Sequence, residues 1–197
     1  EGPKRVVIEP RGINVDPLAS TSTSFHVNYS ILPKLSFEKL DDTWLNIWKN
    51  LEKSIEDKLD LYFEQDNEIN EPKLIRLLSN HLPHNSQLHI ANSTPIRDLE
   101  WFWSSGQVDA TLFGNRGVNG IDGTLGTALG IAHQSKKPTF LLTGELALLH
   151  DSNALLFSAY FKGSLTIILI NNDGGGIFEH LPISQHKAFE KCFATPQ

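Results

Sequence analysis

The chain has 197 residues, of which 40% are hydrophobic and 20% charged, a composition typical of an ordinary soluble globular protein. A net charge of −6 argues against binding to nucleic acid through phosphate neutralisation. Its longest apolar runs, such as 165–170, are too short to cross a bilayer. The single cysteine, Cys192, excludes an internal disulfide framework. We therefore expect no nucleic-acid partner, no membrane span and a reducing, cytoplasmic compartment.

The first forty residues differ in composition from the rest of the chain. Residues 5–9, RVVIE, read as a buried strand ended by Pro10, and 10–40 are rich in Pro, Ser, Thr and Asn. We interpret residues 1–40 as the end of a preceding domain with its connector, and 41–197 as a second domain. Because the chain contains no methionine, we also interpret it as a fragment cut at both ends, so the second domain is expected to be truncated at its C-terminal end.

From Asp41 onward the apolar pattern alternates between helical and strand-like segments. Apolar residues at helical spacing predict a long helix from Asp41, followed by a shorter one over 73–82. The segments beyond are predicted strands at 87–92, 109–114, 138–144 and 164–171, and predicted helices at 95–103, 122–134 and 151–162. This alternation predicts an α/β fold, a doubly wound parallel sheet with helices on both faces. Ligands bind such sheets at the carboxyl ends of the strands.

Two predicted helices have candidate N-caps. Thr94 stands directly before Pro95 at the start of the helix 95–103. Asp151 stands at the start of the helix 151–162, and we expect His150 to pack behind it. We prefer these structural roles to a catalytic pair of His150 and Asp151.

Glu145 and Asn172 each follow a predicted strand, so we expect them at neighbouring strand ends. A carboxylate, an amide oxygen and a nearby glycine carbonyl are hard oxygen ligands that suit Mg²⁺ or Ca²⁺, and Mg²⁺ usually bridges to phosphates. The glycines of NNDGGGIF allow close approach to an anion, and the predicted helix starts at 122 and 151 add partial positive charge. These features predict a metal–diphosphate site. On spacing alone, an acid capping a helix beside a glycine-rich turn explains the pattern about equally well.

Two arginines lie in the same set of loops. Arg97 is the third residue of the helix predicted to begin at Pro95, where the helix dipole disfavours a cation. Its position indicates an anionic partner, such as a carboxylate bound through two hydrogen bonds. Arg116 lies between Gly114 and Gly117 in a neighbouring loop. The alternative for both is a solvated surface arginine.

Several motifs resemble one enzyme family. Gly144-Glu145-Leu146 followed by Asn171-Asn172 resembles the bipartite thiamine-diphosphate motif, Gly-Asp-Gly followed later by Asn-Asn. The longer segments GNRGVNGIDG, LLHDSNAL and NNDGGGIFEHLP resemble the MenD family, the 2-succinyl-5-enolpyruvyl-6-hydroxy-3-cyclohexene-1-carboxylate synthases of menaquinone and phylloquinone biosynthesis. The resemblance covers roughly residues 88–185, with weaker similarity on either side.

This resemblance implies an enzyme of three α/β domains, of which the chain would hold the end of the central domain and most of the C-terminal, diphosphate-binding domain. It implies a transferase that uses thiamine diphosphate and Mg²⁺ (or Mn²⁺) to add 2-oxoglutarate, after loss of CO₂, to isochorismate. The full-length enzyme would be a homodimer or homotetramer, cytoplasmic or, in a photosynthetic eukaryote, in the plastid stroma. The activating glutamate would lie in the N-terminal domain. We therefore expect no catalytic residue in this chain and no turnover by the chain alone.

The resemblance also implies roles for individual residues. The expected metal ligands are Glu145, the Asn172 side chain and the Gly174 carbonyl, and the residues expected along the cofactor are Ile121, Gly144, Leu146 and Asn172. The residues expected at the substrate are Ser93, Arg97 and Arg116, with Ile177, Phe178 and Leu181 as pocket walls. The family has Asp where this chain has Glu145. The extra methylene moves the carboxylate by about 1 Å against a metal that prefers octahedral geometry.

Three alternatives compete with this interpretation. Another thiamine-diphosphate enzyme, similar to acetolactate synthase, would not need the Arg97/Arg116 pair for its small neutral acceptor. In a non-catalytic diphosphate-binding domain, Glu145 in place of Asp would mark a metal site that has lost its function. A dinucleotide-binding domain is disfavoured because no G-x-G-x-x-G follows the first strand of the predicted sheet.

Overall fold

The structure is a computed structural model that describes residues 5–13, 23–30 and 41–197. The chain divides into two compact units, Glu1–Lys53 and Ser54–Gln197. Most of the predicted connector over 10–40 lies outside the described residues, and the predicted boundary at residue 41 stays a prediction.

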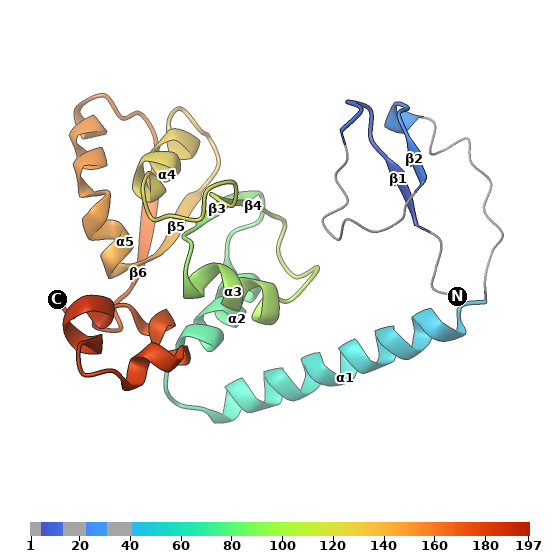
Figure 1. Cartoon of the computed structure of the whole chain (residues 1–197), viewed down its shortest axis with the longest axis horizontal. Helices are drawn as coiled ribbons and strands as arrows, with labels where there is room; N and C mark the ends of the chain where they lie inside the picture. Colours follow the sequence, from blue (N-terminus) through green and yellow to red (C-terminus); the bar gives the residue numbers. More distant parts are fainter. Residues whose placement is uncertain (1–4, 14–22, 31–40) are drawn as a thin grey trace. The chain divides into compact units, whose positions relative to one another are not determined.

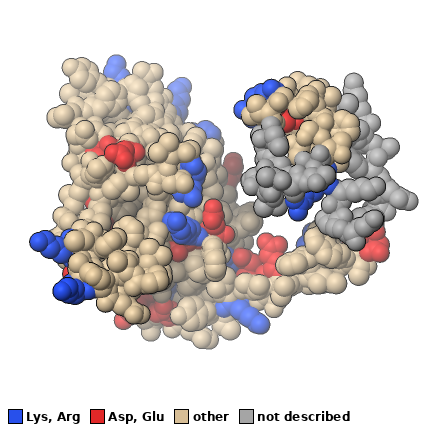
Figure 2. All heavy atoms as spheres, in the orientation of Figure 1, with Lys and Arg blue, Asp and Glu red and all other residues tan. Residues whose placement is uncertain are grey.

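In the described part of the chain, no helix has the length and apolar character needed to cross a membrane. Acidic and basic side chains are interspersed over the face shown in Figure 2.

The first unit contains a two-stranded parallel sheet. Strand β1 (Val6–Ile8) pairs with β2 (Thr23–Phe25), with Val6 opposite Thr23. The predicted strand over 5–9 is therefore confirmed, but its predicted burial is wrong, since Val6 is 58% exposed. A sheet of two short strands buries little apolar surface by itself. Helix α1 (Thr43–Gln65) confirms the helix predicted from Asp41 and runs from the first unit into the second.

The second unit is built on a four-stranded, fully parallel sheet (Figure 1). Its spatial order is β4–β3–β5–β6, and the strands are β3 (Ser86–Ile90), β4 (Ala110–Gly114), β5 (Thr139–Gly144) and β6 (Leu165–Ile170). The chain goes from β3 outward to β4 and then returns past β3 to β5. The strand order therefore reverses between β3 and β5, where the loops after the two strands diverge and open a crevice.

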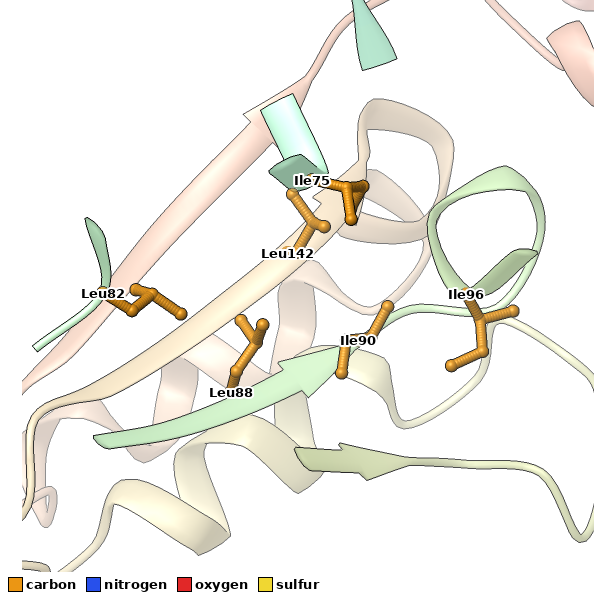
Figure 3. Packing of buried hydrophobic residues seen from close by; sticks show 6 residues of the cluster. All are labelled: Ile75, Leu82, Leu88, Ile90, Ile96 and Leu142. Atoms are coloured by element: carbon orange, nitrogen blue, oxygen red, sulfur yellow. The ribbon is translucent and has the colours of Figure 1, made fainter. Parts of the chain in front are cut away.

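Helices cover both faces of this sheet, as the sequence predicts. Leu141 and Leu142 are successive residues of β5, so their side chains point to opposite faces. Leu142 packs with side chains from β3, from α2 (Glu71–His81) and from α3 (Thr94–Phe102); this cluster contains Ile75, Leu82, Leu88, Ile90 and Ile96 (Figure 3). Leu141 packs with the buried residues Leu125, Ala128 and Leu129 of α4 (Thr124–Ala132). The doubly wound α/β fold is thereby confirmed.

The structure corrects the predicted helix after β5. Helix α5 (Glu145–His150) begins directly at the strand end, and a 3₁₀ segment (Ser152–Ala159) follows it. Asp151 occupies the N-cap position of this segment as predicted, but its side chain makes no capping hydrogen bond to it. Its Oδ2 instead accepts a hydrogen bond of 2.8 Å from the Gly126 backbone N–H of α4. His150 does not pack behind Asp151 either. It is half exposed, and its Nε2 lies 2.9 Å from Asp122 Oδ1.

Two further predicted helix starts are corrected. Thr94 is the first residue of α3, and the residue before it, Ser93, has a φ of 79° and makes no capping hydrogen bond with its side chain. Helix α4 begins at Thr124 rather than at residue 122. Beyond β6 the chain forms three short helical segments, which are Gly176–His180, Pro182–Gln185 and a π-helical turn over Glu190–Ala194.

Candidate functional site

A cavity of about 440 Å³ lies at the carboxyl ends of the parallel strands. Most of its walls come from the end of each strand and the segment after it, within 92–97, 116–121, 144–147 and 170–178, and Glu71 of α2 completes the lining. The switch point between β3 and β5 thus lies at the centre of the lining. This is the position that a doubly wound sheet provides for a ligand.

The cavity gathers almost all the residues that the sequence singles out. The lining includes Ser93, Arg97, Arg116, Ile121, Gly144, Glu145, Leu146, Asn172, Gly174, Ile177 and Phe178. Leu181 is the exception, because it is 49% exposed and does not belong to the lining. Glu71, Asn92 and Asn119 also line the cavity and were missed. Asn92 is the last residue of a predicted strand and Asn119 lies in the loop after another, so their positions indicated this edge of the sheet. Glu71 lies in a helix far upstream, and nothing near it indicated the cavity.

Glu145 connects the ends of the two strands β5 and β6. It is the first residue of α5 and is only 6% exposed. Its Oε1 accepts a hydrogen bond of 2.5 Å from the Gly174 backbone N–H. A carboxylate is favourable in the first turn of a helix, where the backbone N–H groups carry partial positive charge. Glu145 and Gly174, which are 29 positions apart, therefore lie side by side as the sequence predicts.

The glycines after β6 are required by contact with the chain's own backbone. Gly174 has a φ of 130°, and a Cβ added there would lie 2.1 Å from the Ala194 carbonyl oxygen. A Cβ added at Gly175 would lie 2.6 Å from the Phe193 carbonyl oxygen. The Gly175 N–H also donates a hydrogen bond of 2.6 Å to the Ala194 carbonyl. The sequence predicts that these glycines allow close approach to an anion and that the Gly174 carbonyl binds the metal, but it does not predict their packing against the π-helical turn.

Asn172 is held by Glu71 from a distant part of the chain. Its Nδ2 donates a hydrogen bond of 2.7 Å to Glu71 Oε1. The amide oxygen, Oδ1, has no hydrogen-bond partner among the described residues. Asn172 is exposed to solvent, so this contact with α2 is what fixes the orientation of its amide.

The two arginines present unneutralised positive charge to the cavity. Arg116 Nη1 donates a hydrogen bond of 2.8 Å to Asn92 Oδ1, and Arg97 Nη1 donates to the Ser93 carbonyl. Within the described ranges, neither arginine forms a salt bridge with a carboxylate. Since both side chains are exposed and line the cavity, an anionic ligand there would meet two available guanidinium groups.

Asp98 of α3 is electrostatically coupled to the cavity residue Glu71. Burial and, to a smaller extent, the nearby Glu71 carboxylate raise the pKa of the Asp98 carboxyl, and His180 opposes the shift, so that the pKa is about 6. Asp98 Oδ2 and Glu71 Oε2 are both buried and lack a hydrogen bond in the described structure. This edge of the cavity is therefore acidic and sensitive to protonation near neutral pH.

The donor groups at the cavity suit a hard cation that also binds a phosphate. In the parts of the chain that the structure describes, no three His, Cys, Asp or Glu side chains cluster to form a metal cage by themselves. One buried carboxylate, one free amide oxygen and glycine carbonyls remain as oxygen donors. Mg²⁺ is typically held by one or two carboxylates together with substrate phosphates, so this incomplete oxygen set fits Mg²⁺ or the similar Mn²⁺.

Comparison with known proteins identifies relatives along the whole chain, although a scan against models of protein families matches none. The chain is 45% identical to the 2-succinyl-5-enolpyruvyl-6-hydroxy-3-cyclohexene-1-carboxylate synthase of Trichodesmium erythraeum, over 98% of this chain and 34% of that protein. The synthase of the same name from Synechococcus elongatus is 43% identical, over 98% of this chain and 33% of its own length. That of Gloeothece citriformis is 44% identical, over 99% and 34% respectively.

The chain thus spans about a third of the length of the curated relatives it matches. The resemblance seen in the motifs is confirmed, and it extends well beyond residues 88–185. Across nearly its whole length, the chain is homologous to one segment of the 2-succinyl-5-enolpyruvyl-6-hydroxy-3-cyclohexene-1-carboxylate synthases.

Proposed function

We propose that this chain forms the diphosphate-binding part of a thiamine-diphosphate-dependent carboligase that acts in menaquinone or phylloquinone biosynthesis. The reaction adds 2-oxoglutarate, after loss of CO₂, to isochorismate and yields 2-succinyl-5-enolpyruvyl-6-hydroxy-3-cyclohexene-1-carboxylate. The names of the relatives support the reaction, and the cavity supports the placement of cofactor and substrates. The observation that carries the proposal is that segments following four different strands bring the expected metal, cofactor and substrate residues to one cavity.

The end of the cavity near Glu145 and Asn172 would bind the cation and the diphosphate. Glu145, the Asn172 Oδ1 atom and the Gly174 carbonyl would hold Mg²⁺, and Gly144 and Leu146 would lie along the diphosphate. Thiamine diphosphate, when bound, supplies the thiazolium carbon on which decarboxylation and carbon–carbon bond formation depend. The residues of this chain would contribute binding and orientation, and Ile121, which lines the cavity, would pack against the cofactor.

The end of the cavity near Arg97 and Arg116 would bind the substrates. Both substrates are carboxylates, and a guanidinium group binds a carboxylate through two parallel hydrogen bonds. Ser93 would add a hydroxyl at the same place. Ile177 and Phe178 would exclude water from the reacting atoms, which strengthens these charged hydrogen bonds. Leu181 would join this wall only if the Gly176–His180 segment shifts, because it lies outside the lining in this structure.

The test is an activity assay with the full-length protein that contains this chain. With thiamine diphosphate and Mg²⁺, CO₂ release from 2-oxoglutarate should depend on isochorismate, and the named product should accumulate. Pyruvate should not replace 2-oxoglutarate. Turnover of pyruvate alone would support an enzyme similar to acetolactate synthase, and cofactor binding without any turnover would support a non-catalytic domain.

The isolated 197-residue chain should show no turnover under the same conditions. This expectation follows from the family resemblance, which places the activating glutamate in another domain. Product formed by the isolated chain, free of host enzyme, would contradict the assignment of this chain to the diphosphate-binding part alone.

A further inference from the structure

We propose that Glu71 is a positioning residue that turns the Asn172 amide so that its oxygen, and not its nitrogen, is available to a divalent cation in the cavity. The inference rests on the proposed function, because it concerns the same cation site. Glu71 lies 101 positions before Asn172, and neither the motifs nor the family roles include it.

The backbone of Glu71 is firmly fixed. Glu71 is the first residue of α2, and the side chain of the preceding Asn70 caps the helix by accepting a hydrogen bond of 2.9 Å from the Lys73 N–H. Helix α2 is anchored on the sheet by Ile75, which is fully buried. The Glu71 carboxylate therefore reaches the cavity from a rigid element, and a rigid support is what a positioning role requires.

The chemistry of the contact determines which way the amide points. An ionised carboxylate can only accept hydrogen bonds, so the Asn172 group that faces Glu71 Oε1 must be the NH₂. The planar amide then turns Oδ1 away from Glu71. Gly176 leaves room for the amide in this orientation, because a Cβ added there would lie 2.9 Å from Asn172 Nδ2. Without Glu71 the exposed amide would be free to rotate and present its nitrogen, which cannot bind a cation.

The test measures cation binding in the full-length protein. The affinity for Mn²⁺ is measured by paramagnetic resonance in the presence of saturating thiamine diphosphate, with thermal unfolding as a check on folding. Glu71→Ala should weaken Mn²⁺ binding by about tenfold, the lower end of the loss typical when a residue that orients a metal ligand is removed. The unfolding midpoint should stay within about 2 °C of that of the unchanged protein.

Two variants separate an orienting role from a charge effect. Glu71→Gln loses the negative charge but keeps an oxygen that can accept the Asn172 N–H, so it should restore Mn²⁺ binding to within about threefold. Glu100→Ala removes a carboxylate from an exposed position of α3 outside the cavity lining and should leave binding unchanged. If Glu71→Gln is as weak as Glu71→Ala, the helix dipole or the overall charge is responsible, and the inference is wrong.

A double variant separates this inference from the proposed function itself. If Glu71 acts through Asn172, Glu71→Ala combined with Asn172→Ala should bind Mn²⁺ no worse than Asn172→Ala alone. Additive losses would overturn the positioning role. If neither Asn172→Ala nor Glu145→Ala weakens Mn²⁺ binding, the proposed cation site fails. If those two variants weaken binding and Glu71→Ala does not, only the role of Glu71 fails.

Discussion

Asn92 Oδ1 accepts a hydrogen bond of 2.8 Å from Arg116 Nη1, and this contact crosses between the loops that follow β3 and β4. The same side chain donates through Nδ2 to the carbonyl oxygens of Asn115 and Gly120, at 3.0 and 2.7 Å. Asn92 is only 5% exposed, so its amide is buried in each of these hydrogen bonds, although Arg116 itself is exposed. One buried amide therefore holds both the loop after β4 and the arginine that faces the cavity.

Asn92→Ala should lower the free energy of unfolding of the chain by about 1–3 kcal/mol, because two partly buried loop carbonyls lose their hydrogen-bond partner. Urea denaturation measures this change. Asn119→Ala is the matched control, since Asn119 lines the same cavity but is exposed and makes no side-chain hydrogen bond within the described structure. Equal stability of the two variants would show that Asn92 does not hold the loop.

Arg97→Ala and Arg116→Ala should each reduce kcat/KM for the dicarboxylate substrates. A hydrogen bond between charged groups contributes roughly 1.5–3 kcal/mol, so the expected loss is about tenfold to a hundredfold in steady-state kinetics of the full-length protein. Thiamine-diphosphate binding should remain nearly intact. Arg→Lys at either position should restore activity only partly, because an ammonium group cannot form the two parallel hydrogen bonds that a planar guanidinium makes with a carboxylate. Unchanged kinetics in both alanine variants would mean that the arginines are surface charges.

The sheet and the cavity were largely predictable because their signals are local. Four apolar segments separated by amphipathic ones specify a parallel sheet, and the polar residues that directly follow each segment must meet at one edge. Helix boundaries were less predictable. Aspartate is a common N-cap residue, but the Asp151 side chain accepts its hydrogen bond from the Gly126 N–H of another helix, which the local sequence does not indicate.

The least predictable features depend on contacts between distant segments. Nothing near Glu71 indicates a partner at Asn172, and nothing near Gly174 indicates the Ala194 carbonyl. Such contacts arise from how α2 and the C-terminal turn pack onto the sheet, which single-sequence periodicity does not encode.

Gly174→Ala should disrupt the loop after β6. The added Cβ would lie 2.1 Å from the Ala194 carbonyl oxygen, and alanine rarely adopts a φ of 130°. We expect a loss of about 1–3 kcal/mol in the free energy of unfolding from backbone strain, together with weaker cofactor binding. Calorimetry of the chain measures the stability. Gly130→Ala, in an open position of α4, should be neutral or stabilising by about 0.5–1 kcal/mol. A Gly174→Ala variant as stable as Gly130→Ala would contradict the close contact.

Asp98→Asn should stabilise the chain at pH 8 and lose this advantage in acid. The folded-state pKa of Asp98, about 6, lies above the ordinary value of 3.8, so the folded state takes up a proton before the unfolded state does. Stability therefore rises as pH falls from about 6 toward 3.8, and the charged form is unfavourable above pH 6. Chemical denaturation at several pH values should show a gain of about 1 kcal/mol at pH 8 that shrinks toward zero near pH 4. A gain of the same size at pH 4 would contradict this prediction, because the gain would then not come from removing the Asp98 charge.

The position of a bound cation tests the central claim most directly. Crystals of the full-length protein grown with thiamine diphosphate and Mn²⁺ can be measured at the manganese absorption edge, where the anomalous signal locates the ion independently of the surrounding protein. We expect one peak at the carboxyl ends of β5 and β6, within about 2.0–2.6 Å of a Glu145 carboxylate oxygen, Asn172 Oδ1 and the Gly174 carbonyl oxygen. A cofactor-bound structure with manganese elsewhere, or with none of these three atoms as ligands, would contradict it.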